Sequence, residues 1–373
     1  MIARALEGVA RPPVGTRPLV LVGMSGGVDS SVSAALLQRV GWNVAGGFIK
    51  NWSDSKDGWT GECAWRGERR DAMRVAAALG IPLLTFDFEA SYRDKVVETL
   101  FRGYGAGETP NPDVLCNEAI KFGLFMDAAR KMGAAFVATG HYARVVHGDG
   151  PSALLRGIDP DKDQSYFLYR VSQSALKQAL FPIGHLRKPE VREIAAALDL
   201  PVAQKPDSQG ICFIGKLDMQ DFLRTRLPSV PGDVVGPDGN VLGRHTGLDG
   251  YTIGQRQGIA LGGGPAWYVA RKDIASNRLV VVPSADHSLL FASKAMLDDL
   301  HWTAGAAPAL PCRVEVQVRY RQAPVAATME TGEGGAVRLA FDVPVKAVAP
   351  GQSAVLYQGK RCLGGGVILE GVV

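Results

Sequence analysis

The sequence predicts an α/β protein with three parts: an N-terminal domain built on a parallel sheet, a small mixed or β-rich middle domain, and a C-terminal β-barrel. In the N-terminal half, short apolar runs alternate with helical patterns, which indicates parallel strands covered by helices on both faces. Towards the C-terminus the helical patterns give way to strand-like alternation. A chain of 373 residues also exceeds the size at which a single core stops growing, so several domains are expected.

The expected elements follow one another in turn. The N-terminal strands are expected at 19–22, 44–49, 83–88 and 135–138, and the helices at 31–40, 68–79, 92–104, 118–132 and 189–198. Turn signals such as PDGN and GGGP crowd the middle segment, and residues 314–320 then alternate strictly between apolar and polar. Further strands are expected at 354–357 and 367–369. We place the domains at 18–215, 216–290 and 291–373, and expect residues 1–17 to be a flexible N-terminal extension.

Composition narrows the class of protein. The chain is 46% hydrophobic and 21% charged, which is typical of a soluble globular protein. No apolar run approaches the roughly 18 residues of a membrane span, and the N-terminus lacks the apolar core of a secretory signal, so we expect a cytoplasmic protein without a membrane partner. A net charge of +4 permits an anionic partner but restricts any nucleic-acid surface to a local patch. The five cysteines are widely spread without a CxxC pair, which signals neither a disulfide framework nor a metal site.

The stretch SGGVDSS, residues 25–31, joins the first expected strand to a helix. Backbone N–H groups and the positive end of the helix dipole make such a turn an anion site. Gly26 and Gly27 allow phosphate oxygens close to the backbone, and Asp29 could hold Mg²⁺. The loop lacks the lysine that a P-loop carries before its Ser/Thr. An ordinary turn capped by Ser and Asp is the alternative.

Two cysteines lie in stretches suited to chemistry. In TPNPDVLCNEAIKF, residues 109–122, Cys116 comes just before an expected helix, where a thiol has a lowered pKa. Asp113 is close enough in sequence to serve as a general acid or base, although an Asp N-cap followed by a buried cysteine is the alternative. In KPDSQGICFIG, residues 205–215, Cys212 lies in a loop at a domain edge, and a short buried strand is the alternative.

Together these three stretches resemble the tRNA-specific 2-thiouridylase family, which belongs to the PP-loop (N-type ATP pyrophosphatase) superfamily with its Rossmann-like nucleotide domain. The stretches ATGHYAR, KDQSYFLY, YTIGQRQG, RYRQ and PGQSAVLY extend the resemblance from about residue 18 to the C-terminus. The chain departs from the family pattern at Ile49, where methionine is common, and in PDSQGICF, where members often read KDSTGICF. Ile49 keeps the apolar volume, and neither change removes a reactive group.

The resemblance implies a role for each matching residue. Asp113 would be the general acid/base, Cys116 the nucleophile, and Cys212 the cysteine that receives a persulfide from a separate sulfur-donor protein. ATP, with Mg²⁺, would be bound by Gly23, Met24, Ser25, Gly26, Gly27, Val28, Asp29, Ser30, Ile49 and Gly140. The target uridine and its tRNA would be contacted by Asn111, Pro112, Asp113, His141, Lys162, Asp163, Gln164, Arg319, Tyr320 and Gln352. Taken without the resemblance, His141 would be interpreted as a satisfied histidine at a strand end, and the charges of Arg319 and Arg321 as solubilising.

The implied activity is an ATP-dependent sulfurtransferase reaction. AMP would be transferred to the 2-oxygen of the wobble uridine of tRNA, and persulfide sulfur would then replace that oxygen. The loop would hold the leaving pyrophosphate, which accounts for the missing P-loop lysine. Two alternatives remain: a PP-loop amide synthetase that adenylates another substrate, and a non-catalytic tRNA-binding or sulfur-carrier protein. We expect a monomer.

Overall fold

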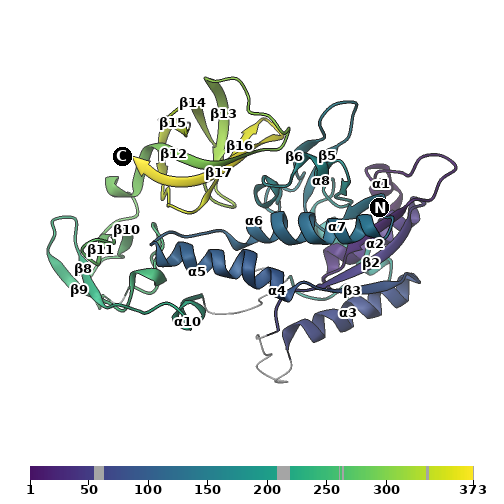
Figure 1. The fold of residues 1–373 in the computed structure, drawn as a ribbon, viewed down its shortest axis with the longest axis horizontal. Helices are drawn as coiled ribbons and strands as arrows, with labels where there is room; N and C mark the ends of the chain where they lie inside the picture. Colours follow the sequence, from purple (N-terminus) through teal and green to yellow (C-terminus); the bar gives the residue numbers. More distant parts are fainter. Residues whose placement is uncertain (54–62, 208–218, 260, 263, 333–335, 373) are drawn as a thin grey trace.

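The computed structural model describes residues 1–53, 63–207, 219–259, 261–262, 264–332 and 336–372 (Figure 1). The three predicted parts follow one another along the chain, with the parallel sheet at one end of the molecule and the middle domain at the other. None of the helices in these ranges is long and apolar enough to cross a membrane.

The N-terminal domain is built on a five-stranded parallel sheet with the order β3-β2-β1-β4-β7, which confirms the predicted class. Its strands are β1 (Leu19–Gly23), β2 (Asn43–Lys50), β3 (Leu83–Asp87), β4 (Phe136–Ala138) and β7 (Ala179–Leu180). Alternate residues of β1 serve two separate cores: Leu21 belongs to one, and Val20 and Val22 belong to the other. The sheet is therefore buried on both faces, as continuous apolar strands require.

Helices cover the two faces of this sheet. They are α2 (Val28–Arg39), α3 (Ala64–Leu79), α4 (Glu89–Tyr92), α5 (Glu98–Gly105), α6 (Pro112–Cys116), α7 (Phe125–Lys131), α8 (Gln173–Leu176) and α9 (Lys188–Ala197). The π-helical segments η1 (Arg93–Val97) and η2 (Asn117–Leu124) join α4 to α5 and α6 to α7, and a 3₁₀ turn, η3, spans Ser165–Leu168.

Residues 2–10 of the N-terminal extension dock on the domain through their own apolar spacing, which differs from the flexible lead-in expected for this part of residues 1–17. Residues Ile2–Glu7 form α1, and Ala5 and Val9 are only 2% and 5% exposed. Ile2, Ala5, Leu6 and Val9 recur at the helical period and pack on the core beneath α2. The indole N–H of Trp42 also donates to the carbonyl of Ala10 at 2.8 Å.

The middle domain is a small mixed sheet. It contains α10 (Met219–Arg224) and the strands β8 (Gly232–Val235), β9 (Val241–His245), β10 (Tyr268–Asp273) and β11 (Arg278–Val282), in the order β10-β11-β8-β9. Strands β8 and β11 are parallel and the other pairs are antiparallel. This arrangement agrees with the mixed middle domain expected from the sequence.

The C-terminal domain is a closed antiparallel barrel. Its strands are β12 (Phe291–Trp302), β13 (Cys312–Gln317), β14 (Val325–Thr331), β15 (Val337–Lys346), β16 (Ser353–Gln358) and β17 (Arg361–Val372). The barrel closes because β12 pairs with both β15 and β17. A hairpin of the N-terminal domain, β5 (Ala143–Val146) and β6 (Ala153–Arg156), continues the sheet from β17, so the barrel is joined to the N-terminal domain by strand pairing.

Candidate active site

The SGGVDSS loop lies between β1 and α2 and needs glycine at its turn. Gly26 has φ +73°, and a Cβ there would lie 2.2 Å from the carbonyl oxygen of Glu68. The hydroxyl of Ser30 donates to the Gly27 carbonyl at 3.2 Å and accepts from the Ser25 amide at 3.2 Å, which closes the turn. The loop therefore has a fixed shape at the N-terminus of α2, where an anion is favoured.

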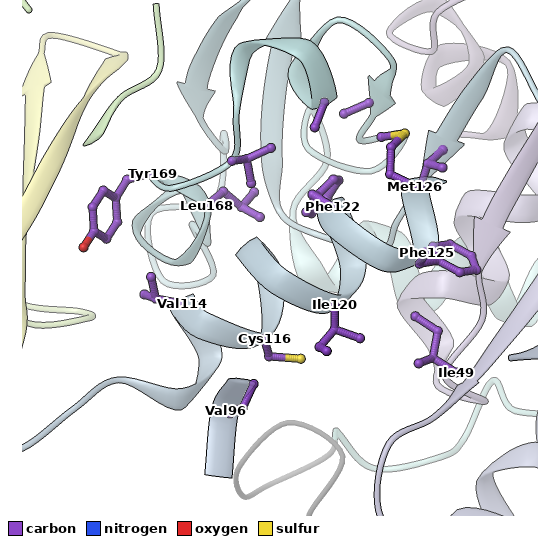
Figure 2. Packing of buried hydrophobic residues seen from close by; sticks show 14 of the residues in the cluster. Ile49, Val96, Val114, Cys116, Ile120, Phe122, Phe125, Met126, Leu168 and Tyr169 are labelled. Atoms are coloured by element: carbon purple, nitrogen blue, oxygen red, sulfur yellow. The ribbon is translucent and has the colours of Figure 1, made fainter. Parts of the chain in front are cut away.

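Gly140, two residues past the end of β4, lies against this loop. A Cβ on Gly140 would lie 2.6 Å from the amide nitrogen of Ser30, so only glycine allows the approach. The side chains of Met24, Val28 and Ile49 are buried, 1%, 4% and 5% exposed. Ile49 belongs to the same core as Phe125 (Figure 2). Gly140, which the family resemblance implied as a nucleotide contact, thus lies beside the loop at the carboxyl edge of the sheet.

Two lysines from outside the loop reach it. Lys188, the first residue of α9, is 8% exposed, and its Nζ lies 2.7 and 2.9 Å from the two carboxylate oxygens of Asp29. Lys205 Nζ donates to the carbonyl of Gly26 at 3.0 Å and to Asp71 Oδ2 at 2.7 Å. The cationic charge that the loop lacks in its own sequence is therefore supplied by a later segment.

Sequence reasoning missed both lysines, although the position of Lys188 in the sequence hints at a carboxylate partner. It occupies the first turn of a helix, where the helix dipole disfavours a positive charge, so an electrostatic partner is needed. Asp29 is that partner, and the Tyr142 hydroxyl also donates to Asp29 Oδ1 at 2.9 Å. Burial and the neighbouring Asp29 carboxylate raise the pKa of Tyr142, so this hydroxyl remains a donor. The Asp29 oxygens are thus already engaged, which does not fit the expectation that they are open to Mg²⁺.

Asp207 connects this end of the site to a residue of the KDQ stretch. Its carboxylate forms ion pairs with Lys188 at 2.9 Å, Lys162 at 2.9 Å and Arg192 at 2.5 Å. Burial alone would raise the pKa of Asp207, but hydrogen bonds from Lys162 and Lys188 bring it well below the usual range. Lys162, predicted to contact tRNA, is therefore tied to the nucleotide end of the site.

Cys116 lies within a helix rather than before one. The helix begins at Pro112, and the side-chain oxygen of its N-cap, Asn111, accepts from the amides of Asp113 and Val114 at 3.2 and 3.3 Å. This corrects the expected start near residue 118: Asn–Pro supplies a better N-cap and first residue than the later Asn117. Cys116 is 0% exposed and packs in the core that includes Val96 and Ile120 (Figure 2). Cys212 lies outside the described residues.

Comparison with known proteins identifies the family. Family models match residues 18–216 (tRNA methyl transferase HUP domain), 220–283 (tRNA methyl transferase PRC-barrel domain) and 292–368 (aminomethyltransferase beta-barrel domain). The tRNA-specific 2-thiouridylase of Ralstonia pickettii (strain 12J) is 51% identical over 354 residues, covering 94% of this chain and 95% of the relative. This chain belongs to the tRNA-specific 2-thiouridylase family.

Another 2-thiouridylase, that of Cupriavidus metallidurans (strain CH34), is 50% identical over 355 residues, which cover 94% of this chain and 98% of the relative. Likeness to solved structures is weaker. The U34-tRNA thiolase NcsA of Methanococcus maripaludis has a TM-score of 0.38 and 16% identity, with 57% of this chain and 67% of that chain covered. The family assignment therefore rests on the sequence relatives and the family models.

Three of the residues expected to contact tRNA in this 2-thiouridylase form hydrogen bonds within the N-terminal domain. Asp163 accepts from the amides of Gly157 and Ser165 at 2.9 and 3.1 Å, and Gln164 Oε1 accepts from the Tyr142 amide at 3.0 Å. His141 lies 2.7 Å from the Thr139 hydroxyl, and burial, together with the charge of Lys121, lowers its pKa well below the usual value. The neutral, satisfied histidine agrees with the interpretation made without the family resemblance.

The C-terminal residues expected to contact tRNA lie at domain junctions. Strand β13 ends at Gln317, so Arg319 lies in the following turn and not on the polar face of a strand. Its guanidinium donates to the carbonyl of Ile253 in the middle domain, and burial lowers its pKa. The ring of Tyr320 packs on Phe167 with centroids 4.5 Å apart. Gln352 Nε2 donates to the carbonyl of Thr109 at 2.6 Å.

Proposed function

We propose that this chain is a tRNA 2-thiouridylase that works in the cytoplasm as a monomer. It uses ATP to adenylate the 2-oxygen of the wobble uridine and then replaces that oxygen with persulfide sulfur, releasing AMP and pyrophosphate. The observation that supports this most is the pairing of a lysine-flanked phosphate loop with Asp113 and Cys116 in one domain of a 2-thiouridylase family member. The loop supplies activation, and the Asp and Cys supply the sulfur chemistry.

The activation step overcomes two weaknesses of a pyrimidine carbonyl, which is a poor electrophile with a poor leaving group. Transfer of AMP to the oxygen corrects both. The amides at the start of α2, together with Lys188 and Lys205, would stabilise charge on the departing pyrophosphate. The resemblance also implies Mg²⁺. The carboxylate of Asp29 is already hydrogen-bonded to Lys188 and Tyr142, so no step of the proposed reaction is assigned to that ion.

The sulfur step would use the two cysteines in sequence. A donor protein leaves a persulfide on Cys212, and its terminal sulfur attacks C2 of the adenylated base, forming the C–S bond. The Cys116 thiolate then attacks the Cys212 sulfur, which forms a disulfide and releases the transferred sulfur to the base. AMP departs with the former 2-oxygen, and an external thiol must reduce the disulfide before the next turnover. Asp113 would take up and return the proton.

Nucleoside analysis of treated tRNA tests this proposal. Cys116→Ser and Cys212→Ser should each abolish 2-thiouridine formation, whereas Cys362→Ser should not. Cys362 matches Cys116 in burial, 0% exposed, but lies in the barrel. Pyrophosphate release that depends on tRNA should persist in the Cys212 variant, since adenylation precedes sulfur transfer. Full product from either active-site variant would contradict the two-cysteine mechanism.

The same assay separates the alternatives. A PP-loop amide synthetase would release pyrophosphate without tRNA and would be insensitive to thiol alkylation. A non-catalytic tRNA-binding or sulfur-carrier protein would release none. Pyrophosphate formed only with tRNA, together with a product heavier by the exchange of oxygen for sulfur, is the expected result.

A further inference from the structure

Thr109 is the point where the three domains meet. It belongs to the N-terminal domain and is 7% exposed. Its amide donates to the carbonyl of Pro350 in the barrel at 2.9 Å, and its carbonyl accepts from Gln352 Nε2 at 2.6 Å. Its hydroxyl lies 3.3 Å from that of Thr252 in the middle domain. Every polar group of Thr109 is therefore satisfied by another domain.

The barrel turn that holds Thr109 is shaped for this close approach. Gly351 has φ +84°, and a Cβ there would lie 2.7 Å from the amide nitrogen of Thr109. Two residues further on, the carbonyl of Ser353 accepts from the hydroxyl of Tyr166 at 2.9 Å. Burial raises the pKa of Tyr166, while a hydrogen bond with the Asn111 side chain opposes that rise. The turn Pro350–Ser353 thus contacts Thr109 directly, and through Tyr166 it is linked to Asn111, the N-cap of α6.

The chain between Thr109 and Asp113 is stiff. Pro110 and Pro112 fix two of the backbone torsions, and Asn111 caps α6 directly after them. A shift of Thr109 is therefore transmitted to Asp113 and Cys116 instead of being absorbed by the linker. Catalytic groups lose rate steeply when they are misplaced by even an ångström or so.

We propose that Gln352 is a positioning residue, which acts through Thr109 to hold Asp113 and Cys116 in place. The side-chain amide of Gln352 donates its hydrogen bond to the backbone carbonyl of Thr109. The barrel then contributes to the chemical steps as well as to tRNA binding. The inference rests on the proposed function for its kinetic consequence, but its structural consequence is independent of the reaction.

Kinetics of Gln352→Ala provide the first test. A positioning role predicts a fall in kcat of about 10- to 100-fold, with the tRNA KM, the directly measured tRNA Kd and its salt dependence all unchanged within about twofold. The control is Gln358→Ala, whose side chain is exposed at the end of β16, the strand that directly follows Gln352, and it should behave as wild type. A weakened, more salt-sensitive tRNA Kd with kcat retained at saturating tRNA would make Gln352 a tRNA contact and overturn the proposal.

A second pair of variants tests the turn without touching Gln352. Gly351→Ala should lower kcat in the same way, because its Cβ would displace Thr109. Gly305→Ala is matched in backbone conformation, φ +82° against +84°, but its Cβ would meet no described atom within 4 Å. Equal activity of the two alanine variants would count against the proposal.

Hydrogen exchange gives a readout that does not depend on the reaction. In the full-length protein without substrates, Gln352→Ala should speed exchange in the peptide containing residues 109–116, and Gln358→Ala should not. Unchanged exchange with Gln352→Ala would overturn the inference even if the wild type makes 2-thiouridine. Faster exchange in a wild-type background that makes no 2-thiouridine would instead refute the proposed function and leave the positioning contact standing.

Discussion

The loop at the N-terminus of α2 and the junction at Thr109 serve one site by different means. At the loop, Lys188 and Lys205 are each paired with carboxylates, and most of the contacts are charged. At the junction, neutral hydrogen bonds from the barrel hold the backbone of Thr109, and the Thr109 hydroxyl lies beside that of Thr252 in the middle domain. Ion pairs are thus concentrated at the loop, where a highly charged phosphate is expected to bind. Neutral hydrogen bonds are concentrated at Thr109, where the position of the backbone has to be maintained.

The pairing at the loop also accounts for how the buried Lys188 and the half-buried Lys205 are tolerated. A buried charge that lacks a partner is strongly destabilising, and Asp29, Asp71 and Asp207 supply partners.

The junction also contains a lysine, but this one has no such carboxylate partner within hydrogen-bond distance among the described residues. Lys272 Nζ, on β10, is buried without a hydrogen-bond partner among the described residues. Burial lowers the pKa of Lys272 to about 8, against the weaker opposing effect of Asp249 and Glu108.

Removal of a loop lysine should have the largest effect. Lys188→Met should slow tRNA-dependent pyrophosphate release by about 100- to 1000-fold, the range seen when one preorganised charge-stabilising group is lost. Lys177→Met, at an exposed position, is the control. Melting curves should accompany the assay, since Asp29 and Asp207 lose a shared partner. Activity within twofold of wild type would mean that the charge at the loop serves folding alone.

The turn of the loop should be the next most sensitive point. Gly26→Ala combines a left-handed backbone with a Cβ 2.2 Å from the Glu68 carbonyl, and we expect a loss of roughly 2–4 kcal/mol in the free energy of unfolding. Gly27 has φ −97°, and its Cβ would meet only the Ser25 hydroxyl, at 3.3 Å. Gly27→Ala should therefore cost about 1 kcal/mol or less. Urea unfolding without nucleotide measures both, and equal losses would show that the steric argument is wrong.

The two regions also differ in how far the sequence predicts them. The strand–turn–helix pattern was enough to place SGGVDSS at the carboxyl edge of the parallel sheet, whereas Gly140 was expected there only from the family resemblance. Lys188 and Lys205 were missed because their partners lie far away in sequence, and only the unfavourable position of Lys188 in a first helical turn hints at them. Helix 112–131 was started too late because the Asn111–Pro112 cap was not weighed against the later asparagine.

The junction could not be predicted from local patterns at all. Gln352 has no local feature that indicates its contact with Thr109, because the bond joins two domains whose placement depends on the pairing of β6 with β17. Arg319 was expected on a strand face, but β13 ends two residues earlier and a turn directs it to the middle domain. The docked α1 was overlooked because a six-residue helix is marginal until it packs on a core.

Lys272, the lysine at the junction whose Nζ has no hydrogen-bond partner among the described residues, gives an expected effect that depends on pH. The pKa of Lys272 is about 8 in the folded protein against an ordinary value of 10.5, so the folded state binds fewer protons than the unfolded state between these two values. Stability contributed by this residue therefore rises with pH across that window, and the charged lysine is destabilising below it. Lys272→Met should raise the free energy of unfolding by about 3 kcal/mol at pH 7, and the gain should fall to well under half of that near pH 10. Lys294→Met, at an exposed strand position, should show no such gain, and the measurement is urea unfolding of wild type and both variants at pH 7, 8.5 and 10. A gain of equal size at all three pH values would come from apolar packing of methionine and not from relief of a buried charge.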